Sequence, residues 1–100
     1  PKKIAIIGGG NLGSAIAEGL LQSDFCKAAN IAITKRNIST LQSLADKGCK
    51  VYNDNQKAIR ESEVVILAIK PYNYSSVLSE IKGMLDLEKH IVISVITGVW

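Results

Sequence analysis

Three glycines near the start of the chain carry its clearest chemical signal. Gly8, Gly10 and Gly13 fit the pattern G-x-G-x-x-G, which binds the pyrophosphate of a dinucleotide. The first glycine permits a sharp turn, the second lets the backbone approach the anion, and the third lets a helix pack closely. The anion would then meet unpaired N–H groups at the positive end of a helix dipole.

The segments on either side of the glycines must hold that turn in place. Residues 4–7 are all apolar, as in a strand buried on both faces of a parallel sheet. Behind the glycines, apolar or small residues recur at helical spacing, at Leu12, Ala15, Ile16, Gly19 and Leu20. We therefore predict strand, glycine turn and helix, and favour dinucleotide binding over a turn that only connects the two elements.

The residues after the second predicted strand indicate which dinucleotide is bound. Residues 30–34 have the pattern of that strand, and an NAD-binding unit would carry an acid after it. This chain has Thr34, Lys35, Arg36 and Asn37 there instead. A guanidinium binds a phosphate through two charge-assisted hydrogen bonds, and an ammonium adds a point charge. We predict a site for the 2′-phosphate of NADP(H), the alternative being a solvated basic turn.

Strand and helix signals alternate along the rest of the chain. An S-x-x-Q capping box at 39–42 predicts a helix that Gly48 ends, and residues 53–55 supply turn residues and a cap for another. The remaining expected elements are strands at 50–52, 64–69 and 91–96, a helix at 56–61, and a helix after Pro71 on which Tyr74, Val77, Leu78 and Ile81 recur at helical spacing. This order predicts a single α/β domain over residues 1–100, a Rossmann-like open parallel sheet with helices on both faces.

Composition and charge bear on location and partners. With 47% hydrophobic residues and no run near the ~20 apolar residues of a membrane span, we expect a soluble chain with no membrane partner. No export leader is visible at the start, so we expect a cytoplasmic location. The net charge of +3 comes largely from scattered basic residues and gives no reason to expect nucleic acid as a partner.

Few side chains suit nucleophilic, acid–base or metal chemistry. Cys26 and Cys49 lack the spacing of metal ligands, so we expect free thiols and no metal site. His90 is the only histidine, and it precedes the fifth predicted strand, at the edge opposite the expected ligand site. We expect a structural role for it. No residue is singled out as catalytic, because a nicotinamide cofactor itself performs hydride transfer.

Several motifs together resemble the amino-terminal domain of the pyrroline-5-carboxylate reductases. They are GGGNLGSA at 8–15, the Asp54-Asn55 pair, VVILAIKP at 64–71 and ISVITGV at 93–99. Their order and spacing match over nearly the whole chain. The most specific piece is the Ala-Ile-Lys-Pro of residues 68–71, close to the Ala-Val-Lys-Pro that ends the fourth strand in that family.

The resemblance implies the last step of proline synthesis, in which a hydride passes from NAD(P)H to a cyclic imine. It implies that Gly10, Asn11 and Leu12 contact the pyrophosphate and that Thr34, Lys35 and Arg36 contact the 2′-phosphate. It also implies that Asn55 contacts a cofactor ribose. The ribose on the nicotinamide side would be contacted by Ala68, Lys70 and Pro71. From sequence physics alone, Asn55 is a helix cap and Lys70 a side chain that reaches water.

The chain also departs from that family. The family holds its imine substrate, and builds its dimer, with a second, all-helical domain, whereas this sequence stops at Trp100. We expect a fragment of a longer homo-oligomeric enzyme. Ile96 and Thr97 stand where family members have two small residues, which could alter the nicotinamide pocket and the acceptor. The alternatives are a reductase that uses a deazaflavin with NADP, and an NADP-binding module without catalytic activity.

Overall fold

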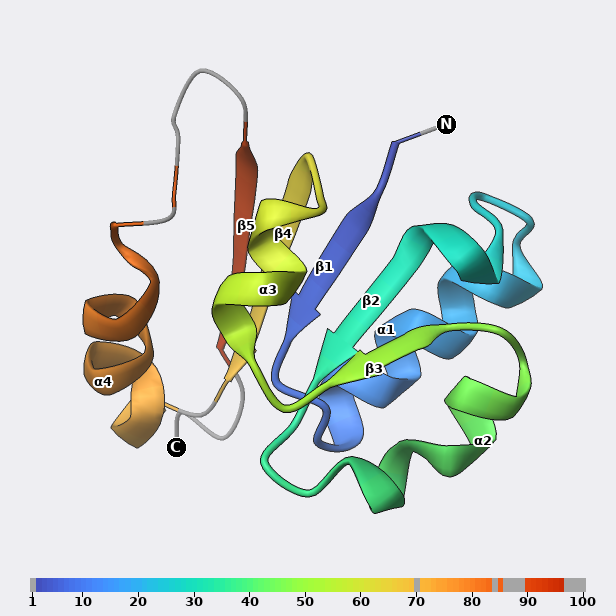
Figure 1. Cartoon of the computed structure of the whole chain (residues 1–100), viewed down its shortest axis with the longest axis horizontal. Helices are drawn as coiled ribbons and strands as arrows, with labels where there is room; N and C mark the ends of the chain where they lie inside the picture. Colours follow the sequence, from blue (N-terminus) through green and yellow to red (C-terminus); the bar gives the residue numbers. More distant parts are fainter. Residues whose placement is uncertain (1, 70, 84, 86–89, 97–100) are drawn as a thin grey trace.

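The computed structural model describes residues 2–69, 71–83, 85 and 90–96, with the backbone alone for residues 71–74 and 96. Five parallel strands form one sheet in the order β3-β2-β1-β4-β5. Their bounds are Ile4–Ile7 for β1, Ile31–Thr34 for β2, Lys50–Tyr52 for β3, Val64–Ile69 for β4 and Ile91–Ile96 for β5. Figure 1 shows the strands running in one direction, with β3 and β5 at the two edges. The predicted open parallel sheet is confirmed.

Helices alternate with the strands along the chain. The α-helices are α1 (Asn11–Gln22), α2 (Gln42–Asp46), α3 (Asn55–Arg60) and α4 (Pro71–Ile81), and two short 3-10 turns are η1 (Ala28–Asn30) and η2 (Ile38–Leu41). The sequence predicted all four α-helices that the described residues form, with bounds that differ by a few residues. Each crossover from strand to parallel strand therefore contains a helix, as is usual for such connections.

Two apolar clusters cover the two faces of the sheet. Successive strand residues point to opposite faces, so β1 buries Ile4 and Ile6 on one face and Ala5 and Ile7 on the other. The first face packs against residues of α1 and α2 such as Ala17 and Leu44; the second packs against residues of α3 and α4 such as Ala58, Ile59 and Ile81. Because both faces are covered at the centre of the sheet, the buried strands β1 and β4 are continuously apolar.

The strand order reverses next to β1. The chain moves outward from β1 through β2 to β3, and then crosses back to place β4 and β5 on the other side of β1 (Figure 1). Register pairs Ile7 with both Thr34 of β2 and Leu67 of β4, so the end of β1 lies between the end of β2 and β4, which continues to Ile69. A reversal of this kind opens a crevice at the carboxyl ends of the strands, where ligands of such sheets bind.

The predicted capping box at residues 39–42 is wrong. Asn37 caps the segment instead: its Oδ1 accepts from the N–H of Ser39 at 3.1 Å and from the Ser39 hydroxyl at 2.7 Å. Ser39 thus donates its hydroxyl to Asn37, and a 3-10 turn precedes the short helix α2. Gly48 follows that helix with φ of +104°, as expected of a glycine that ends a helix.

Candidate functional site

The glycine turn joins the end of β1 to the start of α1, and two of its glycines are required by packing. Gly8 has φ of +108°, and a Cβ there would collide with the carbonyl oxygen of Ala68 in β4. A Cβ on Gly13 would collide with the carbonyl oxygen of Gly8. The turn is therefore held between the end of β4 and the first turn of α1, in the close helix packing that the motif predicts.

Gly10 stands in a different environment. A Cβ built there meets no atom within 4 Å, so open space adjoins the backbone at this position. Gly10 is also the N-cap of α1, with its carbonyl accepting from the Ser14 N–H at 2.9 Å and no side chain to cap the helix. The first-turn N–H groups, including those of Asn11 and Leu12, have no acceptor within the helix. An open helix N-terminus of this kind fits a pyrophosphate.

Thr34 is used inside the protein rather than on its surface. Its side chain is only 2% exposed at the carboxyl end of β2. The hydroxyl oxygen accepts from the Gly8 N–H at 3.3 Å, and the hydroxyl donates to Oδ1 of Asn55 at 2.5 Å. The expectation that Thr34 contacts a 2′-phosphate therefore gives way to another role, because its hydroxyl ties the glycine turn to α3.

Lys35 and Arg36 follow at the carboxyl end of β2. The Lys35 N–H donates to the carbonyl of Tyr52 at 3.0 Å, which extends the pairing of β2 with β3, while its side chain is half-buried and Arg36 is exposed. Neither cation is paired with a carboxylate in the described part of the chain. Asn37, the next residue, has its side-chain oxygen engaged by Ser39. The two cations are the groups at this strand end that suit a phosphate.

Asn55 is the first residue of α3 and not its cap. Asp54 caps the helix, since its carboxylate accepts from the N–H groups of Gln56 at 3.0 Å and Lys57 at 3.3 Å. The Asn55 side chain is half-buried, and its Nδ2 donates to Oε2 of Glu80 in α4 at 2.7 Å. The cap interpretation of Asn55 is thereby corrected. Glu80 gave no signal in the sequence, because a glutamate on a helix is most often a solvated residue.

The nicotinamide side of the expected site is described in part. Ala68 is buried at the end of β4, and its carbonyl faces the position that a Gly8 Cβ would fill. Pro71 begins α4. The prediction for Lys70, and the departure noted at Thr97, lie outside the described residues.

The histidine and the thiols lie apart from the glycine turn. His90 is buried, with Nε2 3.1 Å from the carbonyl oxygen of Ile59, in a structural position. Both cysteines are free thiols. Burial raises the pKa of Cys26, and burial followed by the charge of Glu18 raises the pKa of Cys49. Thiols held in the protonated form make poor nucleophiles.

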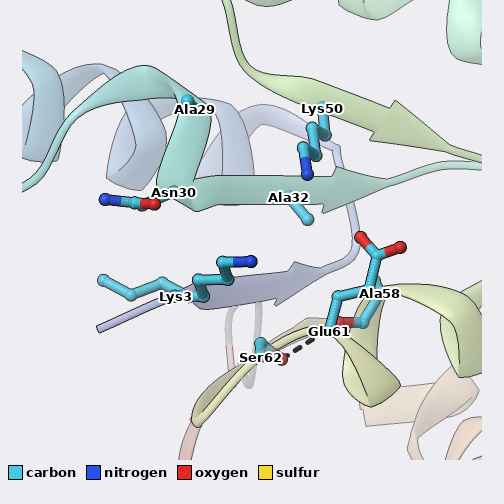
Figure 2. A pocket seen from close by; sticks show the side chains of 9 residues that line it. Lys3, Ala29, Asn30, Ala32, Lys50, Ala58, Glu61 and Ser62 are labelled. Carbon is cyan, nitrogen blue, oxygen red and sulfur yellow. Dashed lines mark hydrogen bonds between the residues drawn. The ribbon is translucent and has the colours of Figure 1, made fainter. Parts of the chain in front are cut away.

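A small cavity of about 10 Å³ lies at the opposite edge of the sheet. Figure 2 shows Lys3, Asn30, Lys50 and Glu61 around it, near the amino ends of the strands, with the Ser62 hydroxyl bonded to the Ala58 carbonyl. Its size suits no more than a water molecule. Over the described ranges, no cluster of three metal-ligating side chains occurs. No helix among the described residues is long and apolar enough to cross a membrane.

Comparison with known proteins gives one family and a consistent set of relatives. Residues 3–98 match the family described as "NADP oxidoreductase coenzyme F420-dependent". The chain is 40% identical over 95 residues to pyrroline-5-carboxylate reductase 1 of Dictyostelium discoideum and 39% identical over 99 residues to the pyrroline-5-carboxylate reductase of Methanosarcina acetivorans. These alignments cover 95% and 98% of this chain.

Solved structures agree with the fold. The structure of a pyrroline-5-carboxylate reductase from Coxiella burnetii superposes with a TM-score of 0.87 at 32% identity over 97% of this chain. The chain spans only 36% of that structure, and 17% and 36% of the Dictyostelium and Methanosarcina relatives. The matched region is thus one domain of considerably longer proteins.

Proposed function

This chain belongs to the family of NADP oxidoreductases that its residues 3–98 match, and from that membership we propose that it is the cofactor-binding domain of a reductase that uses NADP(H). Within the family, we propose a pyrroline-5-carboxylate reductase, which transfers a hydride to the C=N bond of a cyclic imine. The names of the relatives at 40% and 39% identity support this choice of substrate.

The observation that carries the proposal is the contrast among the glycines. Gly8 and Gly13 are packed so tightly that no other residue fits, whereas Gly10 faces open space at the uncapped start of α1. A turn that only joined a strand to a helix would need the tight packing at Gly8 and Gly13. It would not need the open space at Gly10. We assign the pyrophosphate to the backbone of Gly10, Asn11 and Leu12.

Selection of NADP(H) is assigned to the end of β2. Lys35 and Arg36 supply two positive charges without a carboxylate partner in the described residues. Arg36 is exposed and can present its planar fork to a phosphate. Asn55 is assigned to a cofactor ribose, and Ala68, Lys70 and Pro71 to the ribose on the nicotinamide side.

The bound cofactor would supply the hydride, and this domain would bind and orient it. Substrate binding and assembly into a homo-oligomer are assigned to the part of the longer protein that this chain does not include. We place the enzyme in the cytoplasm, in keeping with its two free cysteines.

A second candidate is a reductase that exchanges electrons between NADP(H) and a deazaflavin. The family description, which names coenzyme F420, favours it. A third is an NADP-binding module without catalytic activity.

The test is an assay of the full-length native polypeptide with NADPH and either 1-pyrroline-5-carboxylate or a deazaflavin as the acceptor. The oxidation of NADPH is measured by its absorbance. We expect NADPH oxidation with the imine alone. Oxidation with the deazaflavin alone would replace the first candidate by the second. NADPH binding without oxidation by either acceptor would favour the third.

A further inference from the structure

A chain of hydrogen bonds connects the glycine turn to a carboxylate on α4. The N–H of Gly8 donates to Oγ1 of Thr34 at 3.3 Å, and the Thr34 hydroxyl donates to Oδ1 of Asn55 at 2.5 Å. Nδ2 of Asn55 donates in turn to Oε2 of Glu80 at 2.7 Å. The chain thus joins residues from the turn after β1, the end of β2, the start of α3 and the last turns of α4.

The chemistry of its two ends fixes the direction of every bond. A backbone N–H can only donate, and an ionised carboxylate can only accept. Because Glu80 accepts, the NH₂ group of Asn55 must face it, so the Asn55 oxygen faces Thr34. The Thr34 hydroxyl must then donate to Asn55, which leaves its lone pairs for the Gly8 N–H. Bonds aligned in one direction polarise and strengthen one another.

Glu80 is not needed to hold α4 against α3. Nε2 of Gln56 donates to the backbone carbonyl of Glu80 at 3.0 Å, and that bond is independent of the Glu80 side chain. Ile81 is fully buried in the cluster that α3 and α4 share, so apolar packing also joins the helices. Glu80 is an exposed residue, and its carboxylate accepts a hydrogen bond from the side-chain amide of Asn55.

We propose that Glu80 is a positioning residue for the cofactor site. By orienting the Asn55 amide, its carboxylate directs the Thr34 hydroxyl and so sets the position of the Gly8 N–H in the turn. This inference rests on the proposed function, since the turn is the site assigned to the pyrophosphate. Because both nicotinamide cofactors contain the pyrophosphate, Glu80 supports the binding of NADPH and NADH equally. Arg36, in contrast, supports the binding of NADPH alone.

Three substitutions test the role of the carboxylate. Glu80→Gln keeps an oxygen that can accept from Asn55, Glu80→Leu removes the acceptor, and Glu80→Lys replaces it with a donor that forces the amide to reverse. Ser79→Leu, at the neighbouring exposed position of α4, controls for an added apolar side chain. The thermal midpoint of each variant shows whether it is folded.

The first measurement is the dissociation constant of each cofactor, with the KM and kcat of the full-length polypeptide. We expect Glu80→Leu to raise the dissociation constants of NADPH and NADH equally, by about tenfold, because one charge-assisted hydrogen bond is lost. Glu80→Lys should weaken both further. Glu80→Gln should stay within about threefold of the wild type, and the KM for cofactor should change while kcat does not. Wild-type affinity in Glu80→Leu, or a loss in Glu80→Gln as large as in Glu80→Leu, would overturn the proposal.

The second measurement needs no cofactor and so separates this inference from the proposed function. In proton–nitrogen correlation spectra, the Gly8 amide and the Asn55 side-chain amide should both shift in Glu80→Leu and Glu80→Lys and remain in place in Ser79→Leu. An unmoved Gly8 resonance in Glu80→Lys would contradict the proposed series of hydrogen bonds from Gly8 to Glu80. If the wild type bound neither cofactor while these resonances moved together, the proposed function would fail and the hydrogen-bonded chain would stand.

Discussion

The hydroxyl of Thr34 donates a 2.5 Å hydrogen bond to Oδ1 of Asn55, and the two residues are separated by 21 positions in the sequence. The same hydroxyl accepts from the Gly8 N–H. A buried threonine at the end of β2 thus joins two segments of the proposed cofactor site, the glycine turn and the start of α3. Its position follows from register, because Thr34 pairs with Ile7, the residue just before the turn.

Replacing Thr34 with Val should lower both stability and cofactor affinity. The substitution keeps the shape of the side chain but leaves the Gly8 N–H and the Asn55 oxygen without a partner. We expect a loss of about 1–3 kcal/mol in the free energy of unfolding, measured by chemical denaturation. Thr34→Ser, which retains the hydroxyl, is the matched control. Equal stability of the valine variant and the wild type would show that these bonds contribute nothing.

Replacing Gly13 with Ala should destabilise the protein, while the same change at Gly19 should not. Both glycines lie in α1, but a Cβ at Gly13 would collide with the backbone oxygen of Gly8, whereas a Cβ at Gly19 meets no atom within 4 Å. Alanine at Gly19 should stabilise the helix by roughly 0.5–1 kcal/mol. At Gly13 we expect a lower thermal midpoint, and an unchanged midpoint would mean that α1 does not approach the turn as described.

Replacing Gly10 with Val should abolish the binding of both nicotinamide cofactors. The space beside Gly10 is open in the protein, so the fold should tolerate a side chain there, but the side chain would occupy the position assigned to the pyrophosphate. Binding is measured by calorimetric titration, with circular dichroism as the check on folding. Retained affinity in a folded Gly10→Val variant would reduce the glycine turn to a connector.

Replacing Arg36 with Ala should separate the two cofactors. Loss of a charge-assisted contact to the 2′-phosphate predicts a weakening of NADPH binding by about 2 kcal/mol or more, with NADH nearly unchanged. Lys2→Ala removes an exposed cation near the amino end of β1, at the other edge of the sheet, and should alter neither affinity. Equal losses for NADPH and NADH in Arg36→Ala would argue against a phosphate contact.

The two thiols should react slowly with alkylating reagents in the folded protein. Burial raises the pKa of both above the ordinary value of 9.0, so less thiolate is present at a given pH. Cys49, which is buried, should react more slowly than the half-buried Cys26. A Cys26→Ser variant isolates the Cys49 signal in a mass-spectrometric time course. Labelling of Cys49 as fast in the native as in the denatured protein would contradict its burial.

The raised pKa of Cys49 also makes the free energy of unfolding depend on pH. A thiol whose pKa is raised by folding keeps its proton longer in the native state, so the native state binds more protons when the pH rises above 9.0. The contribution of Cys49 to the free energy of unfolding is therefore fully present below pH 9.0 and is lost as the pH rises above that value through the raised pKa.

Much of the fold could be predicted because local patterns determine it. The continuous apolar runs of β1 and β4 predict buried parallel strands, and the glycine spacing predicts the turn and α1. The cap of η2 was misplaced because Asn37 and Ser39 are both good capping residues, and only their mutual hydrogen bond shows which one accepts.

The site was harder to predict where it depends on packing. Thr34 follows a strand and precedes two cations, so its sequence context suggested a phosphate ligand, and only the register with β1 shows that its hydroxyl faces inward. Glu80 lies 25 positions from Asn55, and their contact depends on how α4 packs beside α3. No local pattern encodes such a pair.

The most direct test of the account is a calorimetric titration of this chain with NADPH and then NADH at one salt concentration. We expect clear binding of NADPH and weaker binding of NADH, because the glycine turn binds the pyrophosphate of both cofactors and the cations after β2 bind the 2′-phosphate of NADPH alone. Equal affinities would contradict the role of Lys35 and Arg36, and no binding of either cofactor would contradict the assignment of the glycine turn itself.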